Sequence, residues 1–214
     1  MPNESENTRP TISNIRKMLS QAEKGGVQNT IQNCVTVLQN DPILADSIRL
    51  NLLSERIDIV KPMGWQRSGP TLTDTDMMYI LRRMEKYGLY SEKRVSAAIR
   101  IVANENHYHP IRDYLNELKW DGTARISRAL HRFLGAAEDE LTTEALKIFL
   151  LGAIKRVFHP GCKFEMMLCL VGGQGAGKSS FFRLLAIKDE WFSDDLRRLD
   201  DDNVFRKLQG HWIM

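Results

Sequence analysis

The chain has 214 residues, which is enough for one large domain or two small domains with a substantial hydrophobic core. Its 30 lysines and arginines against 27 aspartates and glutamates leave a formal net charge of +3, so the overall charge does not require a nucleic-acid partner. The three cysteines, Cys34, Cys162 and Cys169, form no C-x-x-C pair, which argues against zinc and disulfides and for a reducing compartment.

The amino terminus gives no sign of export or of membrane insertion. Its first ten residues, MPNESENTRP, are polar and lack the apolar stretch of a signal peptide. The longest apolar run, IFLLGAI, is too short to span a bilayer. These features predict a cytoplasmic protein without a membrane partner, and they predict a disordered tail over residues 1–10.

Residues 11–160 are predicted to form a mainly helical region. Short helices are expected over residues 11–23 and 27–39, because two adjacent glycines separate two helix-like patterns. A small β-hairpin is expected near residues 48–61, where two β-prone arms flank the sequence LSE.

The next segments carry signals for the start and the end of helices. Thr73 is followed three residues later by Asp76, a pair that can cap a helix start. Ser91 and Pro110 stand where two further helices should begin, and Gly122 is expected to end the last of them. The side chains expected to face inward on these helices are Met77, Ile80, Leu81, Met84, Val95, Ile99, Val102, Ile111, Tyr114, Leu115 and Leu118.

Basic and apolar side chains separate in the sequence DGTARISRALHRFLGA. Arg125, Arg128 and Arg132 recur at i, i+3 and i+7, which places them along one side of a helix. Three arginines in line could contact successive phosphates of single-stranded DNA without reading its sequence. The alternative is the solvated charged face that amphipathic helices ordinarily have, and it is the commoner case. The opposite stripe, expected to be buried, consists of Ile126, Leu130, Phe133 and Leu134.

Two apolar segments come next. Residues 144–158 predict an almost wholly apolar helix, buried between the helical region and a nucleotide-binding core. Residues 164–171, FEMMLCLV, have the length and the nearly continuous apolar character of a buried parallel strand. Cys169 lies inside this predicted strand and is therefore expected in the core.

A glycine-rich stretch, GGQGAGKS at residues 172–179, fits the pattern G-x-x-x-x-G-K-[ST] and predicts a Walker A phosphate loop. Glycines lack a Cβ, so the backbone can take positive φ angles and turn its N–H groups toward phosphate oxygens. Lys178 is expected to meet the β and γ phosphates of ATP as the catalytic residue, and the hydroxyl of Ser179 to bind Mg²⁺. The residues assigned to the nucleotide are Gly172, Gly173, Gln174, Gly175, Ala176, Gly177, Lys178, Ser179 and Ser180.

The segment after the glycines agrees with this prediction. Phe181, Leu184 and Leu185 recur at i, i+3 and i+4, which predicts the start of an amphipathic helix. Strand, glycine loop and helix in that order are the context that a phosphate loop needs. The alternative is an ordinary glycine-rich turn with an exposed lysine, and the flanking pattern argues against it.

Four stretches carry a family resemblance: YHPIRDYLNELKWDGTARI, GAIKRVFHPGCKFEMMLCLVGGQGAGKSSFFRLLA, WFSDDL and LQGHWIM. In this order they resemble the virulence-associated protein E family of phage, prophage and mobile-island NTPases, and the resemblance runs from about Asp46 to the last residue. That family is similar to primase-helicases of superfamily 3, whose AAA+-like cores often assemble into rings. The resemblance therefore implies a replication-linked ATPase that uses ATP and Mg²⁺, forms a homo-oligomer and works with DNA and replication proteins.

The same resemblance places the last five residues, GHWIM, at the start of the strand that would bear the Walker B acids. Those acids would follow Met214, so residues 161–214 are expected to be the first part of a P-loop NTPase domain that ends before them. The expected fold class is α/β, a helical region with a hairpin followed by an incomplete parallel sheet. Asp194 and Asp195 of FSDD could replace the acids, but a helix cap or a solvated turn is the preferred interpretation.

Three classes of function fit these features. The first is a DNA-dependent ATPase or helicase that positions ATP for attack by water. The second is a nucleotide-binding interaction or interference module without catalytic turnover. The third is a small-molecule kinase, which is less favoured because about 170 residues precede the loop and kinases of this kind begin with it. Whether the chain is an enzyme stays open: the resemblance implies an ATPase or helicase, but these 214 residues are expected to lack the acids that hydrolysis needs and to bind nucleotide without appreciable turnover.

Overall fold

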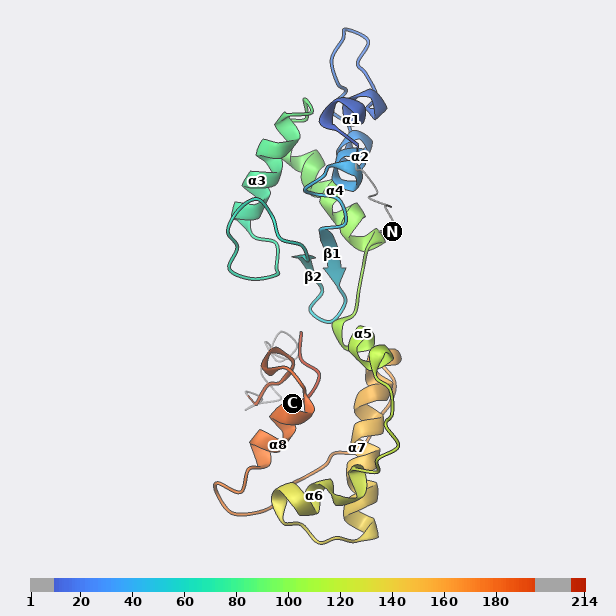
Figure 1. Ribbon diagram of the computed structural model, residues 1–214, viewed down its shortest axis with the longest axis vertical. Coiled ribbons are helices and arrows are strands. Elements are labelled where there is room, and N and C mark those ends of the chain that lie inside the picture. Colours follow the sequence, from blue (N-terminus) through green and yellow to red (C-terminus); the bar gives the residue numbers. More distant parts are fainter. Residues whose placement is uncertain (1–9, 195–208) are drawn as a thin grey trace, which may run out of the picture. The chain divides into compact units, whose positions relative to one another are not determined.

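The structure is a computed structural model that describes residues 10–194 and 209–214 (Figure 1). The described residues form eight α-helices, one short 3-10 helix and one two-stranded sheet, so the fold class is α/β. The parallel sheet of the prediction is not present among them. Apart from Pro10, the tail predicted over residues 1–10 lies outside the described residues.

The chain divides into two compact units, Met1–Tyr108 and His109–Met214. We call them the amino-terminal unit and the carboxy-terminal unit and describe each by itself. The boundary falls at Tyr108, inside the mainly helical region predicted over residues 11–160. None of the described helices has both the length and the apolar character needed to cross a membrane.

Two short helices open the amino-terminal unit, as predicted. Helix α1 spans Ile12–Met18 and helix α2 spans Ile31–Asn40. The hydroxyls of Thr11 and Thr30 each accept the backbone N–H three residues ahead, at 3.4 and 3.1 Å. Such caps satisfy donors that a helix start leaves without an internal partner. Because Thr30 is the cap, α2 begins at Ile31 and not at residue 27.

The predicted hairpin is present. Strand β1 (Ile48–Asn51) pairs antiparallel with strand β2 (Arg56–Ile59), and Ile48 lies opposite Ile59. Both isoleucines are buried. The turn brings Glu55 into the left-handed region at φ 54°, a conformation that tight turns require and that most side chains disfavour.

The next two helices also follow the prediction. Helix α3 spans Asp74–Glu85 and helix α4 spans Glu92–Glu105. The predicted cap of α3 is formed: Thr73 Oγ1 accepts the N–H of Asp76 at 3.2 Å, and the Asp76 carboxylate accepts the N–H of Thr73 at 2.9 Å. Ser91 is the N-cap residue of α4, but its side chain makes no cap hydrogen bond.

All six of these elements contribute to one hydrophobic core. Helix α2 packs against α4, and α4 packs against β1; Figure 1 shows the two helices side by side. Burial of these apolar side chains is the main source of stability in such a unit. The buried side chains are Ile15, Leu19, Cys34, Val35, Val37, Leu38, Leu44, Ile48, Ile59, Ile80, Met84, Tyr87, Leu89, Val95, Ala98, Ile99, Val102 and Ala103.

A buried carboxylate, that of Asp76, ties the segment after β2 to α3. It accepts hydrogen bonds from Arg67 Nε at 2.8 Å and from Trp65 Nε1 at 2.7 Å, besides the cap bond with Thr73. Arg67 Nη1 also donates to the carbonyl oxygen of Ile59 at 3.1 Å. Burial acts to raise the pKa of Asp76, but the donors from Arg67, Trp65 and Thr73 outweigh it and hold the pKa well below its ordinary value.

The carboxy-terminal unit begins with helix α5 (Pro110–Glu117), which starts at Pro110 as predicted. The side chain of His109 caps this helix by accepting the N–H of Arg112. The prediction that Gly122 ends the helix is wrong, because Leu118 already takes an extended conformation after Glu117. The further helices are α6 (Ile126–Leu134), α7 (Glu140–Phe158) and α8 (Lys178–Leu185), and a 3-10 helix spans Asp189–Trp191.

Helix α7 is longer and less buried than predicted. It begins at Glu140, where the Asp139 side chain caps it, and not at residue 144. Its apolar side chains lie on all sides of the helix, and the described segments pack against only part of that surface. The buried residues of α7 are Leu146, Gly152 and Val157, whereas Leu141, Ile148, Leu151, Ile154 and Phe158 are its exposed large apolar residues.

The prediction of a buried strand over residues 164–171 is wrong for the described structure. The segment forms no strand, because no other described segment pairs with its backbone. A parallel strand needs neighbours that take up its N–H and C=O groups. Its second face is therefore uncovered: Cys169 is exposed and not in the core, and Val171 is 97% exposed.

The other face of this segment packs on the helices. The Phe164 ring lies so close to Gly152 of α7 that a Cβ on Gly152 would be 2.2 Å from it. Only glycine permits this approach without moving the ring. Leu168 and Leu170 pack against a small buried cluster formed by Leu130, Leu146 and Phe181.

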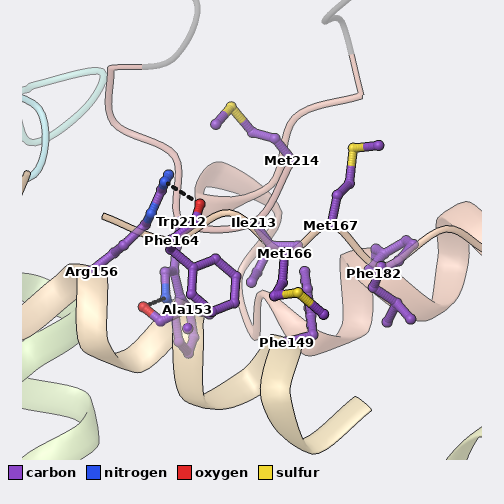
Figure 2. A pocket seen from close by; sticks show the side chains of 12 residues that line it. Phe149, Ala153, Arg156, Phe164, Met166, Met167, Phe182, Trp212, Ile213 and Met214 are labelled. Atoms are coloured by element: carbon purple, nitrogen blue, oxygen red, sulfur yellow. Dashed lines mark hydrogen bonds between the residues drawn. The ribbon is translucent and has the colours of Figure 1, made fainter. Parts of the chain in front are cut away.

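The last described residues return to the 3-10 helix. Phe192 and Ile213 form an isolated parallel bridge, and the N–H of Ser193 donates to the Ile213 oxygen at 3.1 Å. Trp212 Nε1 donates to the Ala153 oxygen of α7 at 3.2 Å, as Figure 2 shows. Within the described residues, GHWIM forms no strand, so the strand start expected there is not present; the segment contributes only this isolated bridge.

Candidate functional site

The glycine-rich loop leads directly into α8. Gly175 and Gly177 have φ angles of 81° and 80°, in the left-handed region that favours glycine. Gly172 and Gly173 are not among the glycines with positive φ, and a Cβ on either would meet no atom within 4 Å. The backbone of the turn therefore favours glycine at positions 175 and 177. Gly172 and Gly173 have open space beside them.

Lys178 is the first residue of α8, and its side chain turns back into the loop. Its Nζ donates to the carbonyl oxygens of Gly172 at 2.8 Å and of Gly173 at 2.7 Å. The ammonium group therefore lies within the curve of the loop, held by neutral acceptors. A phosphate oxygen carries more negative charge than a carbonyl oxygen and would be the stronger partner for this cation.

The first turn of α8 adds further positive potential. The N–H groups at the start of an α-helix have no acceptor within the helix, and the helix dipole places partial positive charge there. Ser179 and Ser180 lie in this first turn and are exposed, as are Gln174 and Ala176 of the loop. An anion at the loop would meet the ammonium of Lys178 and these amides together.

Aromatic packing holds the loop and α8 in place. Phe181 is buried, and Phe182 meets Phe149 of α7 edge to face with 5.5 Å between ring centroids. A Cβ on Gly177 would lie 3.8 Å from the Leu134 side chain, so the end of α6 supports the loop. The amphipathic pattern of α8 predicts that Leu184 faces inward, and this is wrong, because Leu184 is 75% exposed. Phe182 packs against the buried cluster instead.

An apolar pocket of about 340 Å³ adjoins the loop. Gly172, Ala176 and Lys178 form one wall, so the pocket and the candidate phosphate site are continuous. The remaining walls come from the end of α6, the start of α7 and the segment before the loop: Leu130, Leu134, Gly135, Ala136, Leu141, Thr142, Ala145, Leu168, Cys169, Leu170 and Val171. No sequence motif marks these residues, which is why sequence reasoning missed them.

A second apolar pocket, of about 320 Å³, is shown in Figure 2. Its lining includes Phe149 and Phe164 on one side and Trp212 at the carboxy-terminal end. Arg156 Nη2 donates to the Phe164 oxygen at its rim at 3.4 Å. It contains no residue of the glycine-rich loop, so it is not part of the candidate phosphate site.

The predicted arginine stripe is exposed, but acidic groups engage two of its members. Arg125 forms an ion pair with Asp121, in which Nη1 lies 2.9 Å from a carboxylate oxygen, and Arg128 Nε lies 3.2 Å from a Glu138 oxygen. The guanidinium of Arg132 lies 5.5 Å from the centre of the Phe133 ring. On the opposite stripe Leu130 is buried as predicted, whereas the expected burial is wrong for Ile126 and Phe133, which are 39% and 62% exposed.

Acidic and metal-binding side chains do not gather at the loop among the described residues. No group of three or more His, Cys, Asp or Glu side chains in residues 10–194 and 209–214 is arranged to hold a metal ion. Asp194 is exposed. Asp195 lies outside the described residues. Ser179, for which Mg²⁺ binding is predicted, is exposed.

Residues 115–214 match the family model of the virulence-associated protein E-like domain. The matched segment begins within α5 and contains α6, α7, the glycine-rich loop and α8. The predicted family resemblance is confirmed for this part of the chain. No curated protein matches the sequence.

Proposed function

We propose that the chain is the nucleotide-binding part of a replication-linked, DNA-dependent ATPase or helicase of a phage or mobile element. The premise is that residues 115–214 match the model of the virulence-associated protein E-like domain. The family itself indicates a phage-associated protein. The loop that curves around Lys178 at the start of α8 carries the proposal for the nucleotide.

The chemistry follows from the groups at the loop. When a nucleoside triphosphate binds, Lys178 exchanges the carbonyl oxygens of Gly172 and Gly173 for oxygens of the β and γ phosphates. The first-turn amides of α8 face the same phosphates. Ser179 holds Mg²⁺, which supplies charge neutralisation at the phosphates when it is bound.

Catalysis in this class is positioning and charge stabilisation more than covalent chemistry. The loop fixes the phosphates while Lys178 stabilises the charge that develops on them during attack by water. Rapid hydrolysis also needs a group that orients the attacking water and a cation that stabilises the negative charge of the transition state. Single-stranded DNA is the proposed activator, and Arg125, Arg128 and Arg132 are its proposed contacts.

A nucleotide-binding interaction or interference module is the second candidate. It is favoured by the engagement of Arg125 with Asp121 and of Arg128 with Glu138, since DNA phosphates would have to displace both carboxylates. In that case the nucleotide changes the conformation of the carboxy-terminal unit and is not hydrolysed.

The experiment compares wild type with Lys178→Ala. Titration with a fluorescent ATP analogue in the presence of Mg²⁺ should show binding that Lys178→Ala weakens by about 10- to 100-fold, because the variant loses a charge-assisted contact of roughly 1.5 to 3 kcal/mol. Lys155→Ala is the matched control, because Lys155 is an exposed lysine of α7 outside the loop and its removal should change nothing.

Hydrolysis then separates the two candidates. An ATPase of the proposed kind hydrolyses ATP faster with single-stranded DNA, and the stimulation falls in a variant with Arg125, Arg128 and Arg132 changed to glutamine. Binding without turnover, with or without DNA, identifies the interaction module. Equal affinity of wild type and Lys178→Ala would reject the phosphate site in both cases.

A further inference from the structure

Two aromatic rings and a guanidinium stack together in the amino-terminal unit, which lies outside the residues that the family model matches. Trp65 and Tyr79 lie face to face, with 4.9 Å between their ring centroids and 6° between their planes. The guanidinium of Arg82 lies 5.0 Å from the centroid of the Tyr79 ring. The stack joins the segment after β2 to α3.

A small pocket of about 140 Å³ opens at this stack. Trp65, Tyr79 and Arg82 line it, together with Lys86, the C-cap residue of α3. The remaining lining residues are Ile43, Gly64 and Arg83. Trp65 also lines a second hollow of about 520 Å³, which the end of β2 and the segment after it form. The indole ring therefore borders two hollows of the surface.

The cations at this pocket lack acidic partners. Arg82 and Lys86 are exposed, and neither forms an ion pair with a residue that the structure describes. Arg16 of α1 adds a third cation, since its Nε donates to the carbonyl oxygen of Lys86 at 3.0 Å. Arg83 is engaged, because its Nε lies 2.8 Å from the buried carboxylate of Asp41. No carboxylate lines the pocket itself, so an anion there would meet positive potential.

Cations near the end of a helix ordinarily offset the partial negative charge of its last carbonyl groups. At the end of α3, other groups already meet these carbonyls. Arg16 donates to the Lys86 oxygen, and the N–H of Gly88 donates to the Glu85 oxygen at 3.0 Å. The side chains of Arg82 and Lys86 line the pocket beside the aromatic rings instead. Their position therefore suits a ligand as well as the helix end.

We propose that this aromatic and basic surface, formed by Arg16, Trp65, Tyr79, Arg82 and Lys86, binds a single-stranded nucleic acid without reading its sequence. Proteins of that kind combine cations that follow the phosphates with aromatic rings against which unpaired bases stack. A free phosphate would use the cations alone, and the bases of a duplex are already stacked on each other. The aromatic lining therefore favours a single strand, with a base at the Trp65 indole.

This inference goes beyond the proposed function. It places a nucleic-acid contact in the amino-terminal unit, and it needs neither a nucleotide at the glycine-rich loop nor the arginines of α6. The second hollow at Trp65 gives the strand a path past the indole ring. A strand that contacts this surface would leave the glycine-rich loop free to bind nucleotide.

The first experiment measures the affinity of the full chain for fluorescent oligothymidylate and oligouridylate of about 20 nucleotides, by anisotropy at several salt concentrations. The tighter probe identifies the nucleic acid. Arg82→Gln with Lys86→Gln removes two phosphate contacts, so the slope of log affinity against log salt should become shallower by about 1.4. The matched control is Lys93→Gln with Arg100→Gln, which removes the same charge from exposed positions of α4 outside the pocket and should keep the wild-type slope.

The second experiment tests the aromatic rings. Tyr79→Leu keeps an apolar side chain but removes the ring that stacks with Trp65 and Arg82, and it should weaken binding at least about fivefold. Tyr79→Phe keeps the ring and should bind as wild type, because the Tyr79 hydroxyl forms no hydrogen bond with the described residues. A duplex of the same length should bind about tenfold more weakly than the single strand. Thermal unfolding of each variant checks that the fold is kept.

Ultraviolet crosslinking to the oligonucleotide, followed by mass spectrometry, locates the contact. The crosslinked peptide should contain Trp65 or Tyr79. It should do so also in the variant with Arg125, Arg128 and Arg132 changed to glutamine, because those arginines belong to the other unit. Binding of the fluorescent ATP analogue should not change in Arg82→Gln with Lys86→Gln.

The outcomes separate this inference from the proposed function. Equal salt slopes for the two double variants would overturn it and leave Arg82 and Lys86 as cations that stabilise the end of α3. Unchanged affinity in Tyr79→Leu, or a duplex bound as tightly as the single strand, would also overturn it. An acidic peptide of about ten glutamates that binds as tightly as the oligonucleotides would assign the surface to a protein partner instead. Failure of ATP to bind at Lys178 would reject the proposed function and leave this inference in place.

Discussion

The two units of the chain bury their apolar side chains to different extents. In the amino-terminal unit every helix and strand contributes to one closed core, which extends from Ile15 to Ala103. In the carboxy-terminal unit the buried cluster at the loop has three members, Leu130, Leu146 and Phe181. Many of its large apolar side chains are exposed, and among them are Trp120, Leu141, Leu151, Met166, Met167, Val171 and Leu184.

The difference shows that apolar composition does not by itself make a core. Helix α7 has apolar residues on all sides but buries few of them, whereas α4 has one apolar face and buries Val95, Ile99 and Val102 completely or nearly so. An exposed apolar surface beside the glycine-rich loop is what a ligand can cover. The buried core of the amino-terminal unit, in contrast, contributes mainly to stability.

The largest expected difference between the units is in the free energy of unfolding when one leucine in each unit is replaced by alanine. Leu38→Ala removes a fully buried side chain from the amino-terminal core and should cost about 3 to 4 kcal/mol of its unfolding free energy. Leu184→Ala, at a position that is 75% exposed, should cost less than about 0.5 kcal/mol. Amide hydrogen exchange in increasing urea, read by mass spectrometry, follows each unit separately.

Comparable costs for the two truncations would contradict the comparison. A large cost at Leu184 in particular would mean that its side chain is covered in solution, and that the carboxy-terminal unit has a larger core than its described residues form.

A smaller effect comes from the buried ion pair between Arg67 and Asp76. Arg67→Met leaves the Asp76 carboxylate buried without its cation and should cost about 3 kcal/mol in the amino-terminal unit. Lys61→Met is the matched control: its ammonium pairs with Asp46 at 3.2 Å on the surface, so its loss should cost less than about 1 kcal/mol.

The same pair predicts a dependence on pH. Because the pKa of Asp76 is held below its ordinary value, the unfolded chain takes up a proton first as the pH falls. The stability that Asp76 contributes is therefore complete above about pH 4 and is lost progressively below it. In Arg67→Met the pKa of Asp76 moves back toward its ordinary value, so urea titrations between pH 5 and about pH 2 should show a shallower loss than in wild type. An equal slope would show that Arg67 does not set this pKa.

The elements of the amino-terminal unit could be predicted because their signals are local. Thr73 and Asp76 lie three residues apart and cap α3 as their spacing indicates, and Pro110 begins α5 in the other unit for the same kind of reason. The hairpin at residues 48–61 also follows from residues close in sequence. Ser91 shows the limit: it is the N-cap residue of α4, but whether its hydroxyl bonds to the backbone depends on a side-chain rotation that sequence does not specify.

Burial in the carboxy-terminal unit could not be predicted in the same way, because it depends on partners distant in sequence. The apolar run that contains Cys169 and Val171 looks like a strand, but pairing requires a second segment beside it. At the candidate site, the positive φ angles of Gly175 and Gly177 follow from the motif. The pocket beside the loop does not, because Leu141 and Ala145 come from the start of α7, about thirty residues earlier in the chain.

The smallest predicted effect concerns His109, which gives the carboxy-terminal unit a pH dependence in a different range. Its Nδ1 accepts the N–H of Arg112 at 3.4 Å, and this cap of α5 requires a neutral ring with the proton on Nε2. Burial, followed by the charge of Arg112, lowers the pKa of His109 below its ordinary value of 6.5, and the nearby Asp113 opposes this shift.

As the pH falls through about 6.5, the unfolded chain takes up a proton at His109 before the folded chain does. The stability that His109 contributes is therefore present above this pH and is lost below it, by about 1 kcal/mol in all, which is the usual worth of a cap. His109→Asn keeps an acceptor at the cap and removes the titration, so protection of the α5 amides from hydrogen exchange should become independent of pH between 7 and about 5. His109→Ala loses the cap and should be less protected than wild type at pH 7 already. If wild type and His109→Asn lose protection equally over this range, a group other than His109 titrates there. The contrast between the pH dependence set by Asp76 in the amino-terminal unit and that set by His109 in the carboxy-terminal unit would then be wrong.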